Sequence, residues 1–216
     1  LRFIYFEPKI PLTFDSLGYF FYALDTSVLG FLPPNYTPVN NGWPIFLSVF
    51  FSLSPSEDVF SYMQIQKLLS ITLSSLTVIP IYFLCRTFFN RSLSIFGAAL
   101  FAIEPRIIQN SILGVTEPLY ILLGIISLVL FLNNKKMIYV SFAIVALTSI
   151  VRAEALLLLI PYSTMYFIKN GRNIQGIPKY MIAMMIVILI LIPITTYTTE
   201  ILGHDGLTSR FIGGAS

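Results

Sequence analysis

The sequence predicts an all-α protein, a polytopic transmembrane helical bundle with a long first extracytoplasmic loop. Of its 216 residues, 56% are hydrophobic and only 11% are charged, whereas a typical soluble domain carries roughly 25% charged residues. Apolar runs of helical length recur along the chain, and the charges in the polar segments between them divide by sign. This composition excludes an ordinary soluble enzyme, a disordered protein and a nucleic-acid-binding module.

The first polar region, residues 7–60, is predicted to be an extracytoplasmic loop that carries amphipathic helices. Residues 16–30 have a helical amphipathic pattern, and a segment rich in proline, asparagine and glycine follows. The aromatic run IFLSVFFSL at 45–53 then predicts a short helix at the membrane interface. Long ordered loops are usually functional, so this region is a candidate for the active part of the chain.

Six apolar runs predict the helices of the bundle. The first, residues 66–85, has the roughly 20 residues that cross a bilayer whose hydrocarbon core is about 30 Å thick. Shorter runs follow at 92–103, 118–132, 137–150, 155–168 and 179–197. Helices this short suggest local membrane thinning or a water-filled vestibule. We expect all of them to form a single transmembrane domain, residues 1–216, that is part of a longer protein, because the chain begins inside the apolar stretch LRFIYF.

The charged residues predict how these helices are oriented. One set of alternate polar segments holds seven cations and no acid, and the positive-inside rule places it in the cytoplasm. These cations are Arg86, Arg91, Lys135, Lys136, Lys169, Arg172 and Lys179. The other set holds all ten acids and the remaining six cations. Because acids contribute little to the rule, their segregation predicts a functional outer face on a multi-pass protein of the cell membrane, or a lumenal face in the endoplasmic reticulum if the protein is eukaryotic.

Three places on this face carry ionisable residues beside apolar runs, where charge is costly and by default functional. Asp15 starts the amphipathic helix one turn before Tyr19, and it could accept a proton, bind a cation or simply cap the helix. Glu117 lies in GVTEP, where a helix cap is an equally good interpretation. Arg152 and Glu154 lie between two apolar runs and could pair with each other, or Arg152 could hold an anion.

Several other kinds of site have no support in the sequence. A single cysteine, Cys85, excludes an internal disulfide framework, and one histidine with scattered acids matches no zinc pattern. The chain contains no GxGxxG, Walker or Gly-x-Ser-x-Gly motif. Asn35-Tyr36-Thr37 is a glycosylation sequon in the predicted outer loop.

The order of these features resembles the C-type membrane glycosyltransferases, and most closely the protein O-mannosyltransferase and aminoarabinose transferase group, glycosyltransferase family 39. The resemblance covers residues 10–165 and rests on PLTFDSLGY at 11–19, YFLCRTFF at 82–89, AIEP at 102–105, GVTEPL at 114–119 and ALTSIVRAEAL at 146–156. Two positions depart from the family pattern. NGWPI at 41–45 keeps one proline where the family has Lys-Pro-Pro-Leu, and Lys67 stands where arginine is expected.

The resemblance implies sugar transfer from a polyprenyl-phosphate donor, such as dolichyl phosphate mannose, to an acceptor hydroxyl on the extracytoplasmic face. For such a reaction we expect roles for eight residues: Asp15 as general base with Glu117 as a second catalytic acid, Lys67, Arg106 and Arg152 at the donor phosphate, and Tyr19, Trp43 and Glu154 at the substrates. The expected partners are the lipid-linked sugar, a protein, lipid or glycan acceptor, and membrane lipids, with no nucleic acid. No cofactor is certain, and a divalent cation, if bound, would lie at Asp15 and Glu117.

Two other functions are compatible with the residues themselves. In a polytopic transporter or lipid flippase, intramembrane acids are proton or substrate sites. A non-catalytic scaffold subunit is the third possibility, although it would not need every acid on one face. The position of the acids at helix ends on one face favours a one-sided catalytic vestibule.

Overall fold

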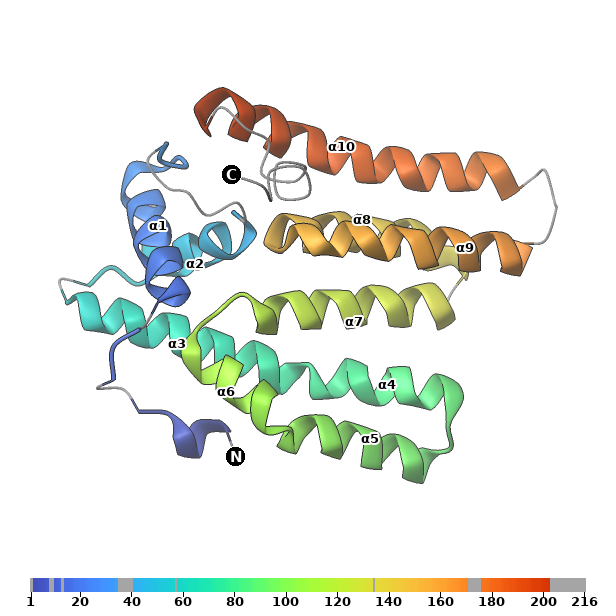
Figure 1. Cartoon of the computed structure of the whole chain (residues 1–216), viewed down its shortest axis with the longest axis horizontal. Coiled ribbons are helices and arrows are strands. Elements are labelled where there is room, and N and C mark those ends of the chain that lie inside the picture. Colours follow the sequence, from blue (N-terminus) through green and yellow to red (C-terminus); the bar gives the residue numbers. More distant parts are fainter. Residues whose placement is uncertain are drawn as a thin grey trace, which may run out of the picture. The chain divides into compact units, whose positions relative to one another are not determined.

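The computed structural model describes residues 2–7, 10–12, 14–34, 41–56, 58–133, 135–170 and 176–202. Every element of secondary structure in these segments is helical, which confirms the predicted all-α class (Figure 1). Contacts divide the chain into two compact units, Leu1–Leu122 and Leu123–Ser216. The sequon at residues 35–37 lies outside the described residues.

The first unit begins with a short 3-10 helix, η1 (Arg2–Tyr5), and continues with α1 (Asp15–Leu29) and α2 (Gly42–Leu53). These two α-helices confirm the helices predicted within residues 7–60, and they pack against each other. Their contact is aromatic, since the fully buried ring of Phe20 lies edge-on to that of Phe51 with 5.8 Å between the centroids. α1 ends at Gly30, whose φ of 75° is the left-handed conformation typical of a helix C-terminus.

α3 (Val59–Leu76) and α4 (Val78–Phe88) are separated by one turn residue, Thr77. Pro80 explains the interruption, because proline has no N–H to donate to the carbonyl one turn earlier in the helix. α3 begins seven residues before the predicted run at 66–85, because the Asp58 side chain accepts a hydrogen bond from the Phe60 amide at 3.1 Å and caps the helix. Together the two helices form the long stretch that runs across the lower half of Figure 1.

α5 (Arg91–Ile103), α6 (Pro105–Leu113) and the start of α7 (Glu117–Asn133) complete the first unit. α5 packs along α4 at a glycine, Gly97, where an added Cβ would lie only 2.9 Å from the sulfur of Cys85. Small residues of this kind let apolar helices approach closely. α6 was not predicted, and it starts at Pro105 with Glu104 accepting a hydrogen bond from the Arg106 amide at 3.5 Å.

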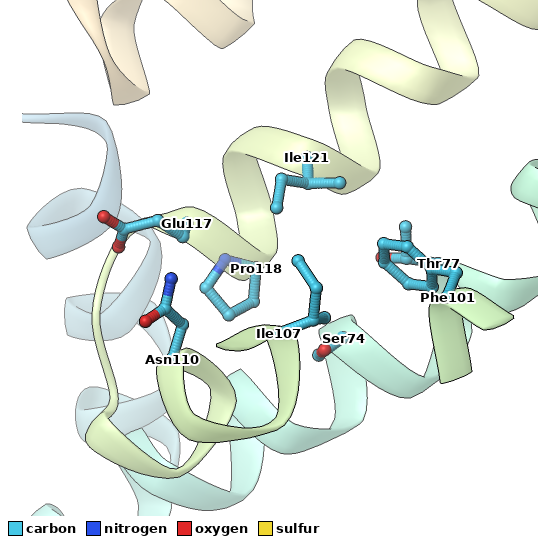
Figure 2. Close-up of a pocket in the computed structure, with 8 residues that line it drawn as sticks. All are labelled: Ser74, Thr77, Phe101, Ile107, Asn110, Glu117, Pro118 and Ile121. Atoms are coloured by element: carbon cyan, nitrogen blue, oxygen red, sulfur yellow. The ribbon is translucent and has the colours of Figure 1, made fainter. Parts of the chain in front are cut away.

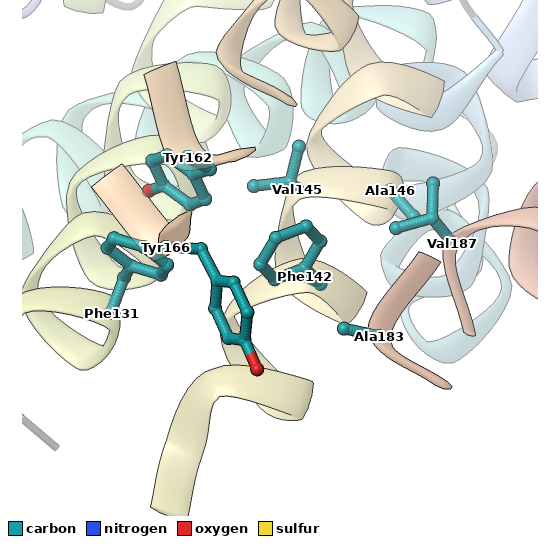
Figure 3. Packing of buried hydrophobic residues seen from close by; sticks show 8 residues of the cluster. All are labelled: Phe131, Phe142, Val145, Ala146, Tyr162, Tyr166, Ala183 and Val187. Carbon is teal, nitrogen blue, oxygen red and sulfur yellow. The ribbon is translucent and has the colours of Figure 1, made fainter. Parts of the chain in front are cut away.

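The second unit contains the rest of α7, η2 (Lys135–Met137), α8 (Ile138–Val151), η3 (Ala153–Leu158), α9 (Leu159–Asn170) and α10 (Gly176–Leu202). Figure 3 shows its core, in which aromatic rings of α7, α8 and α9 meet small side chains of α8 and α10. The rings of Phe131 and Tyr162 are stacked at 4.6 Å, and the hydroxyls of Tyr162 and Ser127 share a hydrogen bond of 2.7 Å. This apolar packing with one satisfied polar pair fixes α9 against α7.

Two stretches are long and apolar enough to cross a membrane. They are Val59–Phe88, with mean hydropathy 2.0, and Gly176–Glu200, with mean hydropathy 2.4. Only 28% and 11% of their apolar windows are buried, unlike the core helix of a soluble protein, which would be mostly buried. The other apolar helices, α2, α5, α7 and α8, are shorter. Membrane-crossing helices are therefore supported at two places, and a multi-pass bundle stays a prediction.

Candidate functional site

Gln66 of α3 lies at the centre of a buried polar junction in the first unit. Its side chain is fully buried, and its Nε2 donates to the carbonyl oxygens of Ser16 at 3.0 Å and Gly114 at 2.7 Å. The Gly114 oxygen also accepts a hydrogen bond of 3.2 Å from the indole Nε1 of Trp43, which is equally buried. The starts of α1 and α2, the middle of α3 and the loop before α7 therefore meet at this junction, which we call the Gln66 junction.

Gly114 permits this close approach for two reasons. Its φ of 74° lies in the left-handed region that only glycine adopts without strain. An added Cβ would also lie 3.2 Å from both Gln66 Cγ and Leu12 Cδ2, closer than a packed side chain normally allows. The glycine of the GVTEPL motif is thus a structural requirement of the junction.

One predicted site residue is a member of this junction, and three others lie close to its members in the sequence. Asp15 directly precedes Ser16, Lys67 directly follows Gln66, Glu117 follows Gly114 by three residues, and Trp43 is itself a member. Buried hydrogen bonds therefore hold the main chains of two predicted motifs, at Ser16 and Gly114, to the side chains of Gln66 and Trp43. Trp43 has its indole nitrogen engaged and its ring stacked on Phe46 at 5.7 Å, so it positions the loop that leads to Glu117.

Asp15 is the first residue of α1 and is exposed. It does not occupy the N-cap, as one interpretation of the sequence had it, because Phe14 takes that position without a side-chain cap. Phe14 has a φ of 46°, the only positive φ of a non-glycine residue in the described part of the chain. Its ring is 92% exposed, so packing does not explain this strained conformation. The strained entry presents the Asp15 carboxylate at the helix N-terminus, where negative charge is favoured. Tyr19, one turn later, is half-buried.

Glu117 lines a pocket that lies within the first unit. The pocket has an empty volume of about 200 Å³ and is lined by Ser74, Thr77, Phe101, Ile107, Asn110, Glu117, Pro118 and Ile121. Figure 2 shows the Glu117 carboxylate and the Asn110 amide at one end and Ser74, Thr77 and Phe101 at the other, with apolar side chains between. α7 begins at Glu117, as the capping interpretation predicts, and the Thr116 hydroxyl donates to its Oε2 at 3.5 Å.

The predicted phosphate-binding cations have different surroundings. Lys67 is 4% exposed, and its ammonium group donates to the carbonyl oxygens of Glu7 and Ile10, so it anchors the segment that leads to Asp15. Arg106 is exposed near the start of α6.

Arg152 and Glu154 lie in the second unit, at the bend between α8 and η3. They form an ion pair of 3.5 Å, which confirms the interpretation that the two side chains pair. Their side chains remain 25% and 39% exposed. Among the described residues, no group of three or more histidine, cysteine, aspartate or glutamate side chains is placed to hold a metal ion.

One functional candidate, Arg2 in η1, was missed by the sequence analysis. Its side chain is 5% exposed, its Nη1 donates to the Ala102 carbonyl oxygen at 3.2 Å, and its guanidinium carbon lies 5.9 Å from the centroid of the Phe101 ring. Burial lowers the pKa of Arg2, because removal from water disfavours the charged form. In the sequence it is only a cation within an apolar stretch, which gives no sign of burial.

Protein-family models, curated proteins and solved structures give no match to this chain. The candidate site therefore rests on its own residues: the Gln66 junction, the strained entry to Asp15 and the pocket at Glu117.

Proposed function

We propose that the protein is a multi-pass membrane glycosyltransferase that moves a sugar from a polyprenyl-phosphate-linked donor to an acceptor hydroxyl on the extracytoplasmic face. The observation that carries the proposal is the Gln66 junction. It ties the main chain next to Asp15 to the loop that leads to Glu117, and these are the two acids of the motifs that resemble glycosyltransferase family 39. Two acids at the starts of separate helices, each within three residues of a carbonyl that is bound at the junction, suit a reaction that needs a base and a second polar group.

Asp15 is the proposed general base. Its exposed carboxylate takes the proton of the acceptor hydroxyl while the hydroxyl oxygen attacks the anomeric carbon of the donor sugar. The bond from that carbon to the phosphate oxygen breaks, and the polyprenyl phosphate leaves with the bonding electrons. The strained backbone at Phe14 supports this role, because such strain concentrates at functional sites.

Glu117 is proposed to orient the sugar or the acceptor at the pocket. The pocket's empty volume of about 200 Å³ includes space that is open to solvent, so its residues offer a partly open wall for a substrate group and do not enclose a whole ligand. Glu117 and Asn110 offer acceptor and donor groups at one end, and the apolar wall between the polar ends suits the face of a sugar ring.

Two other predicted residues of the first unit keep supporting roles in the proposal. Arg106 would stabilise the charge of the leaving phosphate, and Tyr19 would orient the substrates. The polyprenyl chain needs an apolar surface, which the exposed side chains of α5 provide, among them Phe96 at 61% and Ile103 at 58% exposure.

The test is a transfer assay with the purified full chain in liposomes, a panel of radiolabelled polyprenyl-phosphate sugars and mixed acceptors. Asp15→Asn should lower the transfer rate by about 10²–10⁴-fold, the usual contribution of a general base. Asp25→Asn, the same change in the same helix, is the matched control and should retain the rate. Wild-type rates in Asp15→Asn would refute the base assignment. Absence of transfer with every donor, together with solute uptake by the liposomes, would instead identify a transporter.

A further inference from the structure

Arg2 is a buried cation whose hydrogen-bonding capacity is only partly used. Nη1 is engaged by the Ala102 carbonyl, but Nε and Nη2 are buried and have no hydrogen-bond partner among the described residues. None of the described carboxylates forms an ion pair with the guanidinium group. Buried charges in proteins are normally paired, because leaving one uncompensated is strongly unfavourable.

The two unused donors lie on the same edge of the guanidinium plane. Nε–H and one N–H of Nη2 point in parallel, and this is an edge with which arginine binds carboxylate or phosphate through two hydrogen bonds. A carbonyl or water oxygen could accept hydrogen bonds from both donors but would leave the buried positive charge uncompensated, whereas an oxyanion satisfies the donors and neutralises the charge. The free edge therefore matches an oxyanion that presents two oxygens.

The groups already in contact with Arg2 hold it in place without neutralising it. Ala102 lies in the last turn of α5, where the helix dipole favours a cation, and the Phe101 ring adds a cation–π contact. The Phe101 side chain also lines the pocket that contains Glu117. The Phe101 side chain thus contacts both Arg2, where the anion would bind, and the pocket. Lys67 is also a buried cation, but unlike Arg2 it already donates hydrogen bonds to two carbonyl oxygens.

We propose that the free Nε–Nη2 edge of Arg2 binds the phosphate group of a ligand. The assignment of that phosphate to the polyprenyl-phosphate donor rests on the proposed function. Free phosphate is the other source of the same chemistry.

Binding to the purified full chain in detergent tests the proposal, with farnesyl phosphate, farnesol and inorganic phosphate as probes. Wild-type protein should bind farnesyl phosphate more tightly than farnesol. Arg2→Gln should weaken farnesyl phosphate binding by about 10-fold or more, the loss expected for a charge-assisted bidentate contact, and leave farnesol binding unchanged. Arg91→Gln, which removes an exposed cation of the same unit, is the matched control.

Arg2→Lys keeps the charge but not the two-donor edge, so it should bind farnesyl phosphate more weakly than wild type. If Arg2→Gln does not fold, the affinity of Arg2→Lys for farnesyl phosphate tests the proposal in its place. Competition by inorganic phosphate would identify free phosphate as the source, and its absence would identify the lipid phosphate. Equal affinity of wild type for farnesyl phosphate and farnesol, or full affinity in a folded Arg2 variant, would overturn the proposal.

The binding assay does not depend on sugar transfer, so the two proposals fail separately. Phosphate binding that depends on Arg2, in a protein that transfers no sugar, would retain the phosphate site and reject the transferase. Transfer that depends on Asp15, with phosphate binding insensitive to Arg2, would reject the phosphate site and retain the transferase.

Discussion

Replacement of Gly114 by alanine is the sharpest test of the Gln66 junction. The chain supplies two matched controls that separate the possible effects of adding a Cβ. Gly30 has nearly the same φ, 75° against 74°, but nothing lies within 4 Å of its added Cβ. Gly18 lies inside α1 with open space around the added Cβ, so it reports helix propensity alone.

The expected free-energy changes follow from this geometry. Gly30→Ala should destabilise the protein by about 1–2 kcal/mol, the penalty for an L-residue in the left-handed region. Gly18→Ala should stabilise it by about 0.5–1 kcal/mol, because alanine favours a helix interior. Gly114→Ala adds contacts of 3.2 Å to Gln66 and Leu12, and overpacking of this kind costs about 1–3 kcal/mol more. We therefore expect a total destabilisation of about 2–5 kcal/mol.

Thermal unfolding in detergent, followed by circular dichroism, measures the three variants side by side. For a chain of this length, each kcal/mol shifts the melting temperature by about 2–4 °C, so Gly114→Ala should melt roughly 10 °C below wild type. It should also lose sugar transfer, because the displaced carbonyl is the one that Trp43 and Gln66 hold. The reasoning is refuted if Gly114→Ala melts no lower than Gly30→Ala.

Two further predictions concern Phe14 and the Arg152–Glu154 pair. Phe14→Gly should be more stable than Phe14→Ala by about 1 kcal/mol, because only glycine adopts a positive φ without strain. This is the reverse of the usual order of the two residues. Melting temperatures measure the order, and an alanine variant as stable as the glycine variant, or more stable, would contradict the prediction. A double-mutant cycle of Arg152→Gln and Glu154→Gln should give a coupling energy below about 1 kcal/mol, since both side chains are partly exposed, and a clearly larger value would show a desolvated pair.

Helices bounded by turn-forming residues could be predicted almost to the residue. The runs at 92–103, 118–132 and 137–150 correspond to α5, α7 and α8 within one residue at each end, because Asn90, the Thr116-Glu117-Pro118 cap and the lysines at 135–136 interrupt hydrophobic patterns clearly. α3 begins earlier than predicted, because polar residues in its first two turns conceal the helix from a search for apolar runs. α6 was missed because its mixed composition, PRIIQNSIL, lacks a long apolar run.

The candidate site could be predicted only where side-chain chemistry marks the sequence. Asp15 and Glu117 stand out as acids beside apolar helices. The Gln66 junction does not, because it joins Gln66 to main-chain carbonyls 50 and 48 residues away, and a carbonyl oxygen is present at every residue. The contact of Arg2 with Ala102 spans 100 residues and has the same character. Such pairings depend on tertiary packing, which local patterns do not encode.

The bond from Trp43 to the Gly114 carbonyl gives the protein an intrinsic optical reporter. Trp43 is the only tryptophan in the chain, so all indole emission comes from a ring that is fully buried and hydrogen-bonded at the junction. Any event that shifts the loop before Glu117 changes the surroundings of this one fluorophore. Stopped-flow fluorescence can therefore follow ligand arrival in the unlabelled protein, in real time and before any product is formed.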